Sequence, residues 1–569
     1  MSKTESKVKE LVEQIERGEL RLPEMQRKYV WQAPRVRDLL DSLYRGYPSG
    51  AILVWETGGD IAQQDFAVGQ EKNPYVTTKL LLDGQQRLTS LSAVIRGEEV
   101  MVRGRKKPID IFFNLEHPDA LSFVTEVEEE SDEGDEGEGT DGEESIDAAE
   151  DELSRRFSQM AFVVASKRLA QLPQWISVTE VFKSNSDAPF LEKAGVESLK
   201  DPRFAKYSSR LERLRAIKNY PYTVHILGRD MSYEEVTEIF VRVNSLGAKL
   251  KSSDLATAQI TAKWRNSLKE FEQFSSECAT EGFPTDTGLV VRNLVSLITG
   301  QSRFKTVNGI SEDRLRENWP ASKEAMRFAL NFARSNAGID SIALLSSPAI
   351  LVALAAYGHV HEHKVSDQNA KDLLRWFLLA NAKGRYTRGS AETVLDQDLG
   401  VINRDEGIDG LMRLLRAQVG RLPFESEDLV GRNQRSSVFK AMFLAFRDAD
   451  ARDWDSNLKI SVKHSGATHK LQFHHVFPKA LLRDRYEQRM VNDVANLAFI
   501  GGKTNRRISA KEPGVYLKAM LDAGQESLLK SQCIPLDVAL FTVEKFPAFL
   551  EKRRELIAKR LNEFMVVGS

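Results

Sequence analysis

Cysteine is scarce in this chain of 569 residues, which contains only Cys278 and Cys533. Two cysteines are too few for a disulfide framework and are not spaced as a zinc cluster, which favours a reducing compartment. The first twenty residues lack the apolar segment of a signal peptide. The apolar stretch 341–358 is interrupted by two serines and a proline, so it is too short to span a membrane. We therefore expect a cytoplasmic protein with no membrane association.

The composition has no extreme feature that would indicate an unusual class of protein. Hydrophobic residues make up 41% of the chain and charged residues 28%, which excludes a fibrous or mostly disordered protein. At roughly 150 residues per domain, the length predicts three or four domains and excludes a single small binding module.

The formal net charge of −2 hides an uneven distribution of charge along the chain. Residues 126–152 contain sixteen acidic residues and no lysine or arginine, so the rest of the chain carries a net charge of +14. We expect this acidic segment to be a disordered insertion, either a solubilising loop or a strip that competes with nucleic acid. Residues 431–569 contain 24 basic and 15 acidic residues, which would favour contact with nucleic acid there.

The spacing of apolar residues divides the chain into three parts and predicts a multidomain α+β protein. Residues 1–260 mix helix-like periods with short strand-like runs, which predicts an α+β domain. Residues 261–430 show helical spacing, which predicts a helical bundle, and residues 431–569 form a third domain. Short strands are expected at 75–82, 109–113, 222–227 and 457–462.

The segment 472–509 contains the residues that are best suited to catalysis. A strand is expected to end in His474 and His475, whose side chains would point to opposite faces, so that one binds a metal ion and the other faces a substrate. Asn505 is expected to begin a helix, where its amide oxygen would complete a metal site beside His474. Two protein ligands leave positions on Mg²⁺ or Mn²⁺ for water and a phosphate oxygen. A neutral imidazole suits a general base, for which His475 is the candidate.

A buried pair of histidines, capped by asparagines in turns, is the structural alternative. The order of the motifs HHVFP, NL and KTNRRIS, however, resembles the HNH or ββα-metal endonucleases, in the variety that ends in asparagine. The resemblance implies His474 and Asn505 as metal ligands and His475 as general base. It also implies that Asn496 fixes the loop and orients the base. Many members have Asp in place of the first ligand, so the preferred metal stays open.

A second group of polar residues lies in the first part of the chain. The sequence DGQQR at 83–87 follows an expected buried strand and opens a helix, whose backbone N–H groups and Arg87 would suit a phosphate. The segment RLPEMQRKYVW places Gln26 and Arg27 after a proline turn, and a third segment, FVRVNSLG, adds an arginine and an asparagine. Each segment alone is also explained by plain strand–turn–helix packing.

Taken in order, these three segments resemble the ParB/sulfiredoxin-like domain of GmrSD-type restriction enzymes. The resemblance implies a domain that binds and hydrolyses a nucleoside triphosphate, often GTP. The residues that it implies for the nucleotide site are Asp83, Gly84, Gln85, Gln86 and Arg87 in the centre, Gln26 and Arg27 beside them, and Arg242 and Asn244 near them.

The expected protein is therefore a fused type IV restriction enzyme, with a nucleotide-binding sensor in residues 1–260 and an HNH nuclease in residues 431–569. It would cut modified phage DNA with a divalent metal ion and GTP or another nucleoside triphosphate. Two alternatives stay open: an unregulated HNH nickase or nuclease with a DNA-recognition domain, and a ParB-like DNA clamp switched by nucleotide. Assembly into a homo-oligomer also stays open.

Overall fold

The computed structural model divides the chain into two compact units, Met1–Asn266 and Ser267–Ser569. Arg27 and the acidic segment 126–152 lie outside the described residues, so the predicted disorder of that segment stays a prediction. No helix in the described part of the chain is both long and apolar enough to cross a membrane. The described residues are 2–26, 29–57, 63–71, 79–102, 105–107, 109–118, 157–166, 168–246, 252–461 and 471–566.

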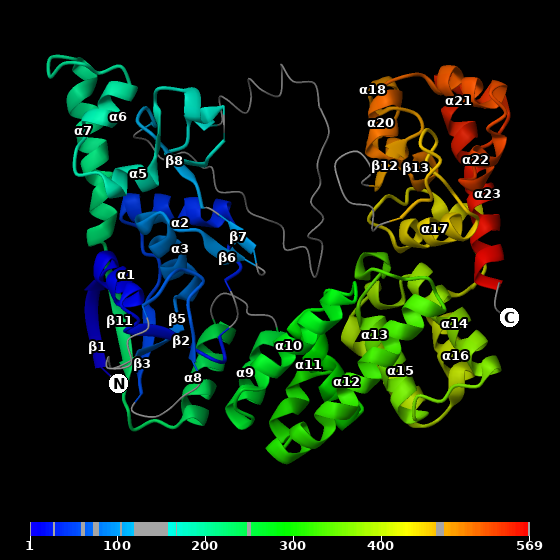
Figure 1. The fold of residues 1–569 in the computed structure, drawn as a ribbon, viewed down its shortest axis with the longest axis horizontal. Helices are drawn as coiled ribbons and strands as arrows, with labels where there is room; N and C mark the ends of the chain where they lie inside the picture. The colour runs from blue at the N-terminus through cyan, green and yellow to red at the C-terminus, as the bar shows by residue number, and fades with distance from the viewer. Residues whose placement is uncertain are drawn as a thin grey trace. The chain divides into compact units, whose positions relative to one another are not determined.

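A mixed six-stranded sheet forms the centre of the first unit (Figure 1), in the order β1-β11-β3-β5-β2-β4. Neighbouring strands alternate between antiparallel and parallel pairing from β1 to β4. The strands expected at 222–227 and, from residue 79 on, at 75–82 are confirmed as β11 and β5. The strands are β1 (Ser2–Lys7), β2 (Leu20–Pro23), β3 (Ile52–Glu56), β4 (Gln63–Gln64), β5 (Lys79–Asp83) and β11 (Pro221–Leu227).

Helices cover both faces of this sheet, which explains why β5 reads KLLLD without alternating polar residues. Leu81 faces a core shared with the first three helices, whereas Leu80 and Leu82 pack with Tyr233 and Phe240 of α8 on the other face. Burial on both faces fixes the end of β5, where the DGQQR segment begins. The covering helices are α1 (Val8–Glu16), α2 (Ala33–Arg45), α3 (Gln85–Arg96), α8 (Tyr233–Leu246) and α9 (Ser252–Lys263).

Smaller elements extend the first unit beside this sheet. The strand expected at 109–113 is confirmed as β8, the central strand of a three-stranded antiparallel sheet with the order β10-β8-β9. The other elements are β6 (Val100–Val102), β7 (Arg105–Lys107), β8 (Ile111–Asn114), β9 (Phe162–Val164), β10 (Trp175–Ser177), α5 (Val178–Lys183), α6 (Ala188–Lys193) and α7 (Pro202–Arg215).

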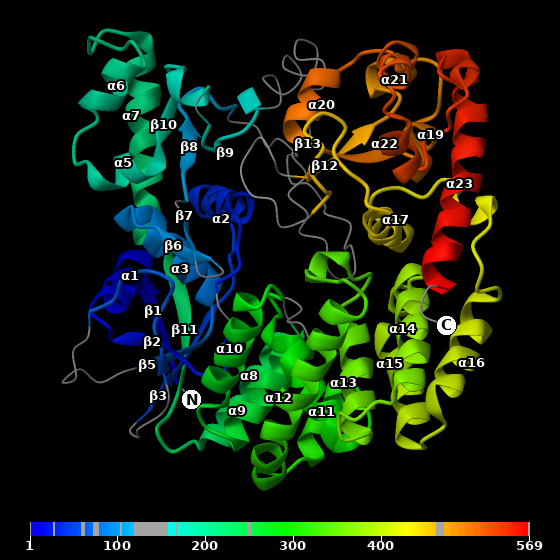
Figure 2. The ribbon, with the colours of Figure 1, turned by 45° about the vertical axis from the view of Figure 1, so that its right-hand side comes forward.

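The second unit begins with the expected run of helices (Figure 2), and no strand occurs between residues 267 and 419. α13 is apolar on all sides and is buried over most of its length, because neighbouring helices surround it. The helices of this run are α10 (Ser267–Thr280), α11 (Thr287–Thr299), α12 (Glu312–Ser335), α13 (Ala349–Val360), α14 (Asp367–Ala382), α15 (Ala391–Asn403) and α16 (Gly407–Val419).

Two paired strands, with helices before, between and after them, complete the second unit. β12 and β13 pair antiparallel with His474 opposite Ala498, and α20 follows β13 directly. The elements are α17 (Ser437–Asp448), β12 (Leu471–His475), α18 (Lys479–Leu482), α19 (Gln488–Val491), β13 (Leu497–Gly501), α20 (Gly502–Ile508), α21 (Pro513–Asp522), α22 (Glu526–Ser531) and α23 (Phe546–Val566).

The prediction of a strand at 457–462 was wrong for residues 457–461, the part of this range that the structure describes. Lys459 forms only an isolated bridge with Arg452. Asn457 has a left-handed φ of 57°, and the buried carboxylate of Asp453 accepts hydrogen bonds from the backbone of Asp455 and Ser456. These contacts close a turn at residues 454–456, and the residues that follow it pair with residues 451–453 through one isolated bridge instead of forming a strand.

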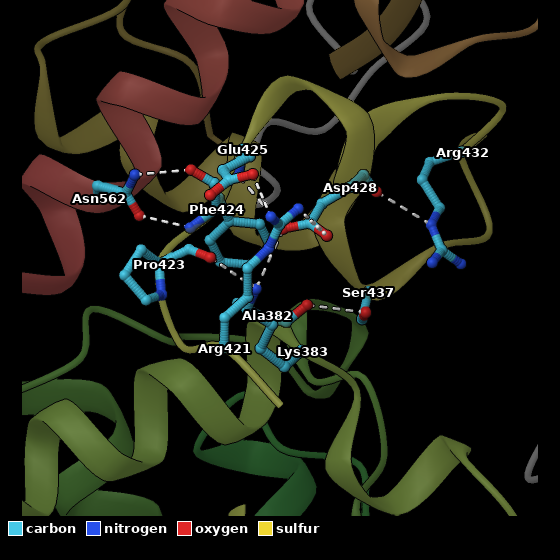
Figure 3. Close-up of polar contacts among 10 residues, drawn as sticks. All are labelled: Ala382, Lys383, Arg421, Pro423, Phe424, Glu425, Asp428, Arg432, Ser437 and Asn562. Atoms are coloured by element: carbon cyan, nitrogen blue, oxygen red, sulfur yellow. Dashed lines mark hydrogen bonds and ion pairs between the residues drawn. The ribbon is translucent and has the colours of Figure 1, made fainter. Parts of the chain in front are cut away.

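The connection between the helical run and the β12–β13 region is held by side chains from both (Figure 3). Lys383, which follows α14, lies 3.8 Å from the ring centroid of Phe424, and its Nζ donates to the Pro423 carbonyl at 3.2 Å. Asn562 of α23 exchanges two hydrogen bonds of 2.8 Å with the backbone of Phe424. The two parts of the second unit are therefore joined by specific contacts as well as by the chain.

Arg553 of α23 is fully buried and holds the start of β13. Its guanidinium donates to the carbonyl oxygens of Ala495 and Leu497, each at 2.8 Å, and to that of Gln532 at 3.1 Å. The side chain of Gln532 pairs with both backbone groups of Phe499, as a neighbouring strand would do. The C-terminal helix thus fixes β13, the strand that leads to α20.

We expect Arg553→Ala to lower the free energy of unfolding by on the order of 3–5 kcal/mol, because it leaves three buried carbonyl oxygens without their donor. Urea denaturation of the full chain measures this loss. Lys559→Ala on the same helix is the control, since the Lys559 side chain is 76% exposed and its removal should cost less than about 0.5 kcal/mol. Equal effects of the two substitutions would contradict the role given to Arg553.

Candidate active site

His474 lies near the end of β12, with only 3% of its surface exposed. Its Nδ1 atom lies 2.8 Å from Oδ1 of Asn505, so the structure brings together the two side chains predicted as metal ligands. Asn505 does not begin its helix as expected, because α20 starts at Gly502 and Asn505 lies in its middle. One helical turn therefore precedes Asn505 and sets the direction of its side chain.

The start of α20 is held by the carboxylate of Asp453. Asp453 Oδ2 accepts a hydrogen bond of 2.6 Å from the Gly501 N–H, and Oδ1 accepts one of 2.7 Å from the Thr504 hydroxyl. Burial acts to raise the pKa of Asp453, but the hydrogen bonds that it accepts outweigh burial and lower this pKa. An ionised carboxylate at a helix start stabilises the helix, and here it fixes the position of Asn505.

His475 follows His474 in the strand and is partly exposed. Its Nε2 atom lies 3.2 Å from Oδ1 of Asn492, in the loop after α19. Sequence reasoning did not identify Asn492, although it stands only four residues before Asn496. The signal that would have found it is the presence of two asparagines, rather than one, in the segment between the two strands.

Asn496 is fully buried and binds backbone groups on two sides. It accepts from the Phe477 N–H at 2.8 Å and donates to the carbonyl oxygens of Phe477 at 3.1 Å and Val491 at 2.9 Å. It therefore connects the turn after His475 with the end of α19. Its hydrogen bonds reach the backbone next to His475, whereas the imidazole itself contacts Asn492.

Both histidines are neutral at pH 7, because burial lowers the pKa of each to about 4. The positive charge of Lys479 further lowers the pKa of His475. Neutral imidazole is the form that binds metal ions and the form that accepts a proton. The protonation state of both side chains thus agrees with the roles predicted for them.

The His474–Asn505 pair has the chemistry of a small divalent metal site. Two ligand atoms that bind one cation at right angles, with bonds of about 2.1 Å, lie about 3 Å from each other. This distance is close to the 2.8 Å between Nδ1 of His474 and Oδ1 of Asn505. An amide oxygen suits Mg²⁺ and Mn²⁺, whereas an imidazole nitrogen is more typical of transition-metal ions, so the two ligands together leave the preferred metal open. Among the described residues, no group of three or more His, Cys, Asp or Glu side chains is placed to hold a metal ion. The pair therefore fits a site completed by water or substrate.

The DGQQR segment of the first unit forms the expected strand, turn and helix. Gly84 has a left-handed φ of 102°, and a Cβ there would lie 2.5 Å from Cδ1 of Ile52, so glycine is required. Arg87 donates to the carbonyl oxygens of Ser49 and Ala51 and, at 3.1 Å, to Oδ2 of Asp83. The guanidinium therefore binds the loop before β3.

The glutamines of this constellation also bind backbone. Gln86 Oε1 accepts hydrogen bonds from the N–H groups of Val30 and Trp31, at 2.9 and 3.1 Å. Gln26 Nε2 donates to the carbonyl oxygen of Leu82 at 2.6 Å, at the end of β5. Gln85 is buried. Gln26 is thus brought beside the DGQQR segment, as predicted.

The third segment behaves differently from the first two. Arg242 lies on α8, where its side chain is 74% exposed and forms an ion pair with Glu238 at 2.7 Å. Asn244 lies in the same helix, and its side chain is outside the described residues. The contacts of Arg242 do not join it to DGQQR, and the nucleotide role of both residues stays a prediction.

Comparison with known proteins supports the reading of the first unit. Residues 8–261 match the family model described as GmrSD restriction endonuclease, N-terminal domain. The match supports a relation of the first unit to the GmrSD-type family. An uncharacterized protein of Methanocaldococcus jannaschii is 23% identical over 545 residues, which cover 90% of this chain and 86% of the relative. The GmrSD-type match ends before the β12–β13 region, whereas the likeness to the uncharacterized protein continues through both units.

We expect the stability of the metal-free second unit to fall as the pH falls from about 6.5 to 4. The two histidine pKa values of about 4 lie below the ordinary value, so in this window the unfolded chain binds more protons than the folded chain. Thermal unfolding at pH 7, 5.5 and 4.5 measures the effect. A variant with His474→Gln and His475→Gln isolates it from other titrating groups, and an equally steep decline in that variant would contradict the assignment.

Proposed function

We propose that this protein is a metal-dependent DNA endonuclease of the HNH type that restricts modified phage DNA and is regulated by a nucleoside triphosphate. The observation that carries the proposal is the His474–Asn505 pair, 2.8 Å apart, with His475 at the next position of the strand. The two paired strands and the following helix that hold these side chains, β12, β13 and α20, have the order of a ββα unit. The match of the first unit to a GmrSD-type domain independently suggests a function related to restriction endonucleases.

His475 acts as the general base in this proposal. Asn492 Oδ1 accepts the hydrogen of Nε2, which leaves the lone pair on Nδ1 to take a proton from the attacking water. Asn496 fixes the turn that follows His475 and so limits movement of the strand end. A divalent cation held by His474 and Asn505 would supply positive charge beside the scissile phosphate and the leaving 3′ oxygen.

Basic side chains next to these residues support DNA as the substrate. Lys503 and Arg506 are exposed on α20, two positions before and one position after Asn505. Lys479 is exposed and lies near enough to His475 to act on its charge. Such side chains bind phosphates without regard to sequence. Recognition of the modification is then assigned to the first unit.

The nucleotide is proposed to bind at the N-terminus of α3, where Gly84 precedes the helix without a side-chain cap. Helix N-termini bind phosphate groups through their backbone N–H groups. Asp83 is partly exposed at the end of β5 and is the acidic group of this motif. GTP is the first candidate, because the resemblance of the motifs to the GmrSD-type domain implies a nucleoside triphosphate that is often GTP.

One observation favours a nuclease that works without nucleotide. Arg87 and Gln86, which would otherwise be available to phosphate groups, bind backbone atoms of the 29–31 and 49–51 loops instead. In this second candidate, DGQQR is a packing element and the first unit serves only to recognise DNA.

We expect His475→Ala to reduce the cleavage rate of modified phage DNA, with Mg²⁺ or Mn²⁺, by about 10²- to 10⁴-fold, because the general base is lost. Circular dichroism confirms that the variant is folded. His361→Ala is the control, since His361 is partly exposed at the end of α13 and should not affect the rate. A wild-type rate in His475→Ala would remove this residue from the mechanism.

We expect Asp83→Asn to lose most nucleoside-triphosphate turnover while cleavage without nucleotide is unchanged. Asp41→Asn is a closely matched control, because Asp41 pairs with Arg45 four residues later, with the same side-chain exposure of the arginine, 14%, as in the Asp83–Arg87 pair. GTP hydrolysis and thermal stability are measured for both variants. If the two variants hydrolyse GTP equally, or if the wild type shows no turnover, the nuclease without nucleotide is the better account.

A further inference from the structure

Two aromatic rings pack against His474 at the buried edge of the proposed metal site. His474 packs edge-on against Trp454 at 6.0 Å and against Tyr516 of α21 at 5.9 Å between ring centroids. Trp454 and Tyr516 also contact one another at 6.3 Å. The His474 imidazole is therefore shielded from water, and its protonation pattern is set by protein groups rather than by solvent.

The hydrogen bonds of Tyr516 determine which nitrogen of His474 carries the proton. The hydroxyl oxygen lies 2.8 Å from the carbonyl oxygen of Val476 and 3.4 Å from Nε2 of His474. A carbonyl oxygen can only accept, so the single hydroxyl hydrogen of Tyr516 is used there. Toward His474 the hydroxyl oxygen can then only accept, so this contact is favourable only when Nε2 carries the hydrogen.

A hydrogen on Nε2 leaves Nδ1 with an unprotonated lone pair, because a neutral imidazole carries one hydrogen. Nδ1 faces Oδ1 of Asn505, which is also an acceptor, at 2.8 Å. Two acceptors at this separation repel each other unless positive charge lies between them. A cation between the two atoms removes this repulsion, so the Nε2–H tautomer is the form in which both atoms can bind a metal ion.

We propose that Tyr516 is a positioning residue, which holds His474 in the Nε2–H tautomer so that Nδ1 and Asn505 Oδ1 can bind a divalent cation. This inference rests on the proposed function and extends it to a residue outside the HNH motif. Because Tyr516 also binds the carbonyl oxygen of Val476, the residue after His475, it connects the metal site with the turn that supports the general base. Partners of this kind orient metal-binding histidines and increase metal affinity.

The test is Mn²⁺ binding to the full chain, measured by electron paramagnetic resonance and calorimetry without DNA. Tyr516→Phe keeps the ring and removes the hydroxyl, and we expect affinity about 10- to 100-fold weaker than in the wild type. Tyr486→Phe is the matched control, because the Tyr486 hydroxyl donates to the Val543 carbonyl oxygen at 2.9 Å without contact to His474. Equal affinity in all three proteins would overturn the inference while leaving the metal site in place.

A second measurement does not depend on the folding of any variant. Nitrogen-15 chemical shifts of His474 in the metal-free wild-type protein identify its tautomer, and the Nε2–H form is expected. The Nδ1–H form would overturn the inference. If the wild type binds no Mn²⁺, or if His474→Ala binds as tightly as wild type, the proposed function itself fails at this site, which distinguishes its failure from that of Tyr516.

Discussion

The buried guanidinium of Arg553 is the contact on which the candidate active site depends most. It binds the carbonyl oxygens of Ala495 and Leu497, the residues on either side of Asn496. Asn496 in turn holds the backbone of Phe477, two residues after His475. A charge from the C-terminal helix therefore fixes, through one asparagine, the turn that follows the proposed general base.

Burial of so many polar groups is tolerated in the second unit because they bind one another. Asp493, fully buried, accepts hydrogen bonds from Arg554 and from the backbone of Gly431 and Ala495. Burial lowers the pKa of Arg553 to about 10, so it stays protonated at neutral pH. A network of this kind is stable only when its members are all present, which makes the site rigid and sensitive to single substitutions.

The sequence predicted the elements and the chemical groups better than it predicted their contacts. The strand ending in His474 and His475 and the DGQQR turn followed from local patterns. The contacts of Asn492 and Tyr516 did not, because neither residue belongs to the motifs that placed Asn505 beside His474, and no local pattern connects them to histidines 17 and 42 residues away. The backbone contacts of Arg87 were missed for a different reason, because a phosphate and the carbonyl oxygens of Ser49 and Ala51 attract the same guanidinium.

The central claim is that His474 and Asn505 together hold a divalent cation next to His475. A crystal structure of the full chain grown with Mn²⁺, with anomalous scattering recorded at the manganese edge, tests it most directly. The account predicts an anomalous peak between Nδ1 of His474 and Oδ1 of Asn505. A peak elsewhere, or a protonated Nδ1 that donates to Asn505 with no ion bound, would contradict it.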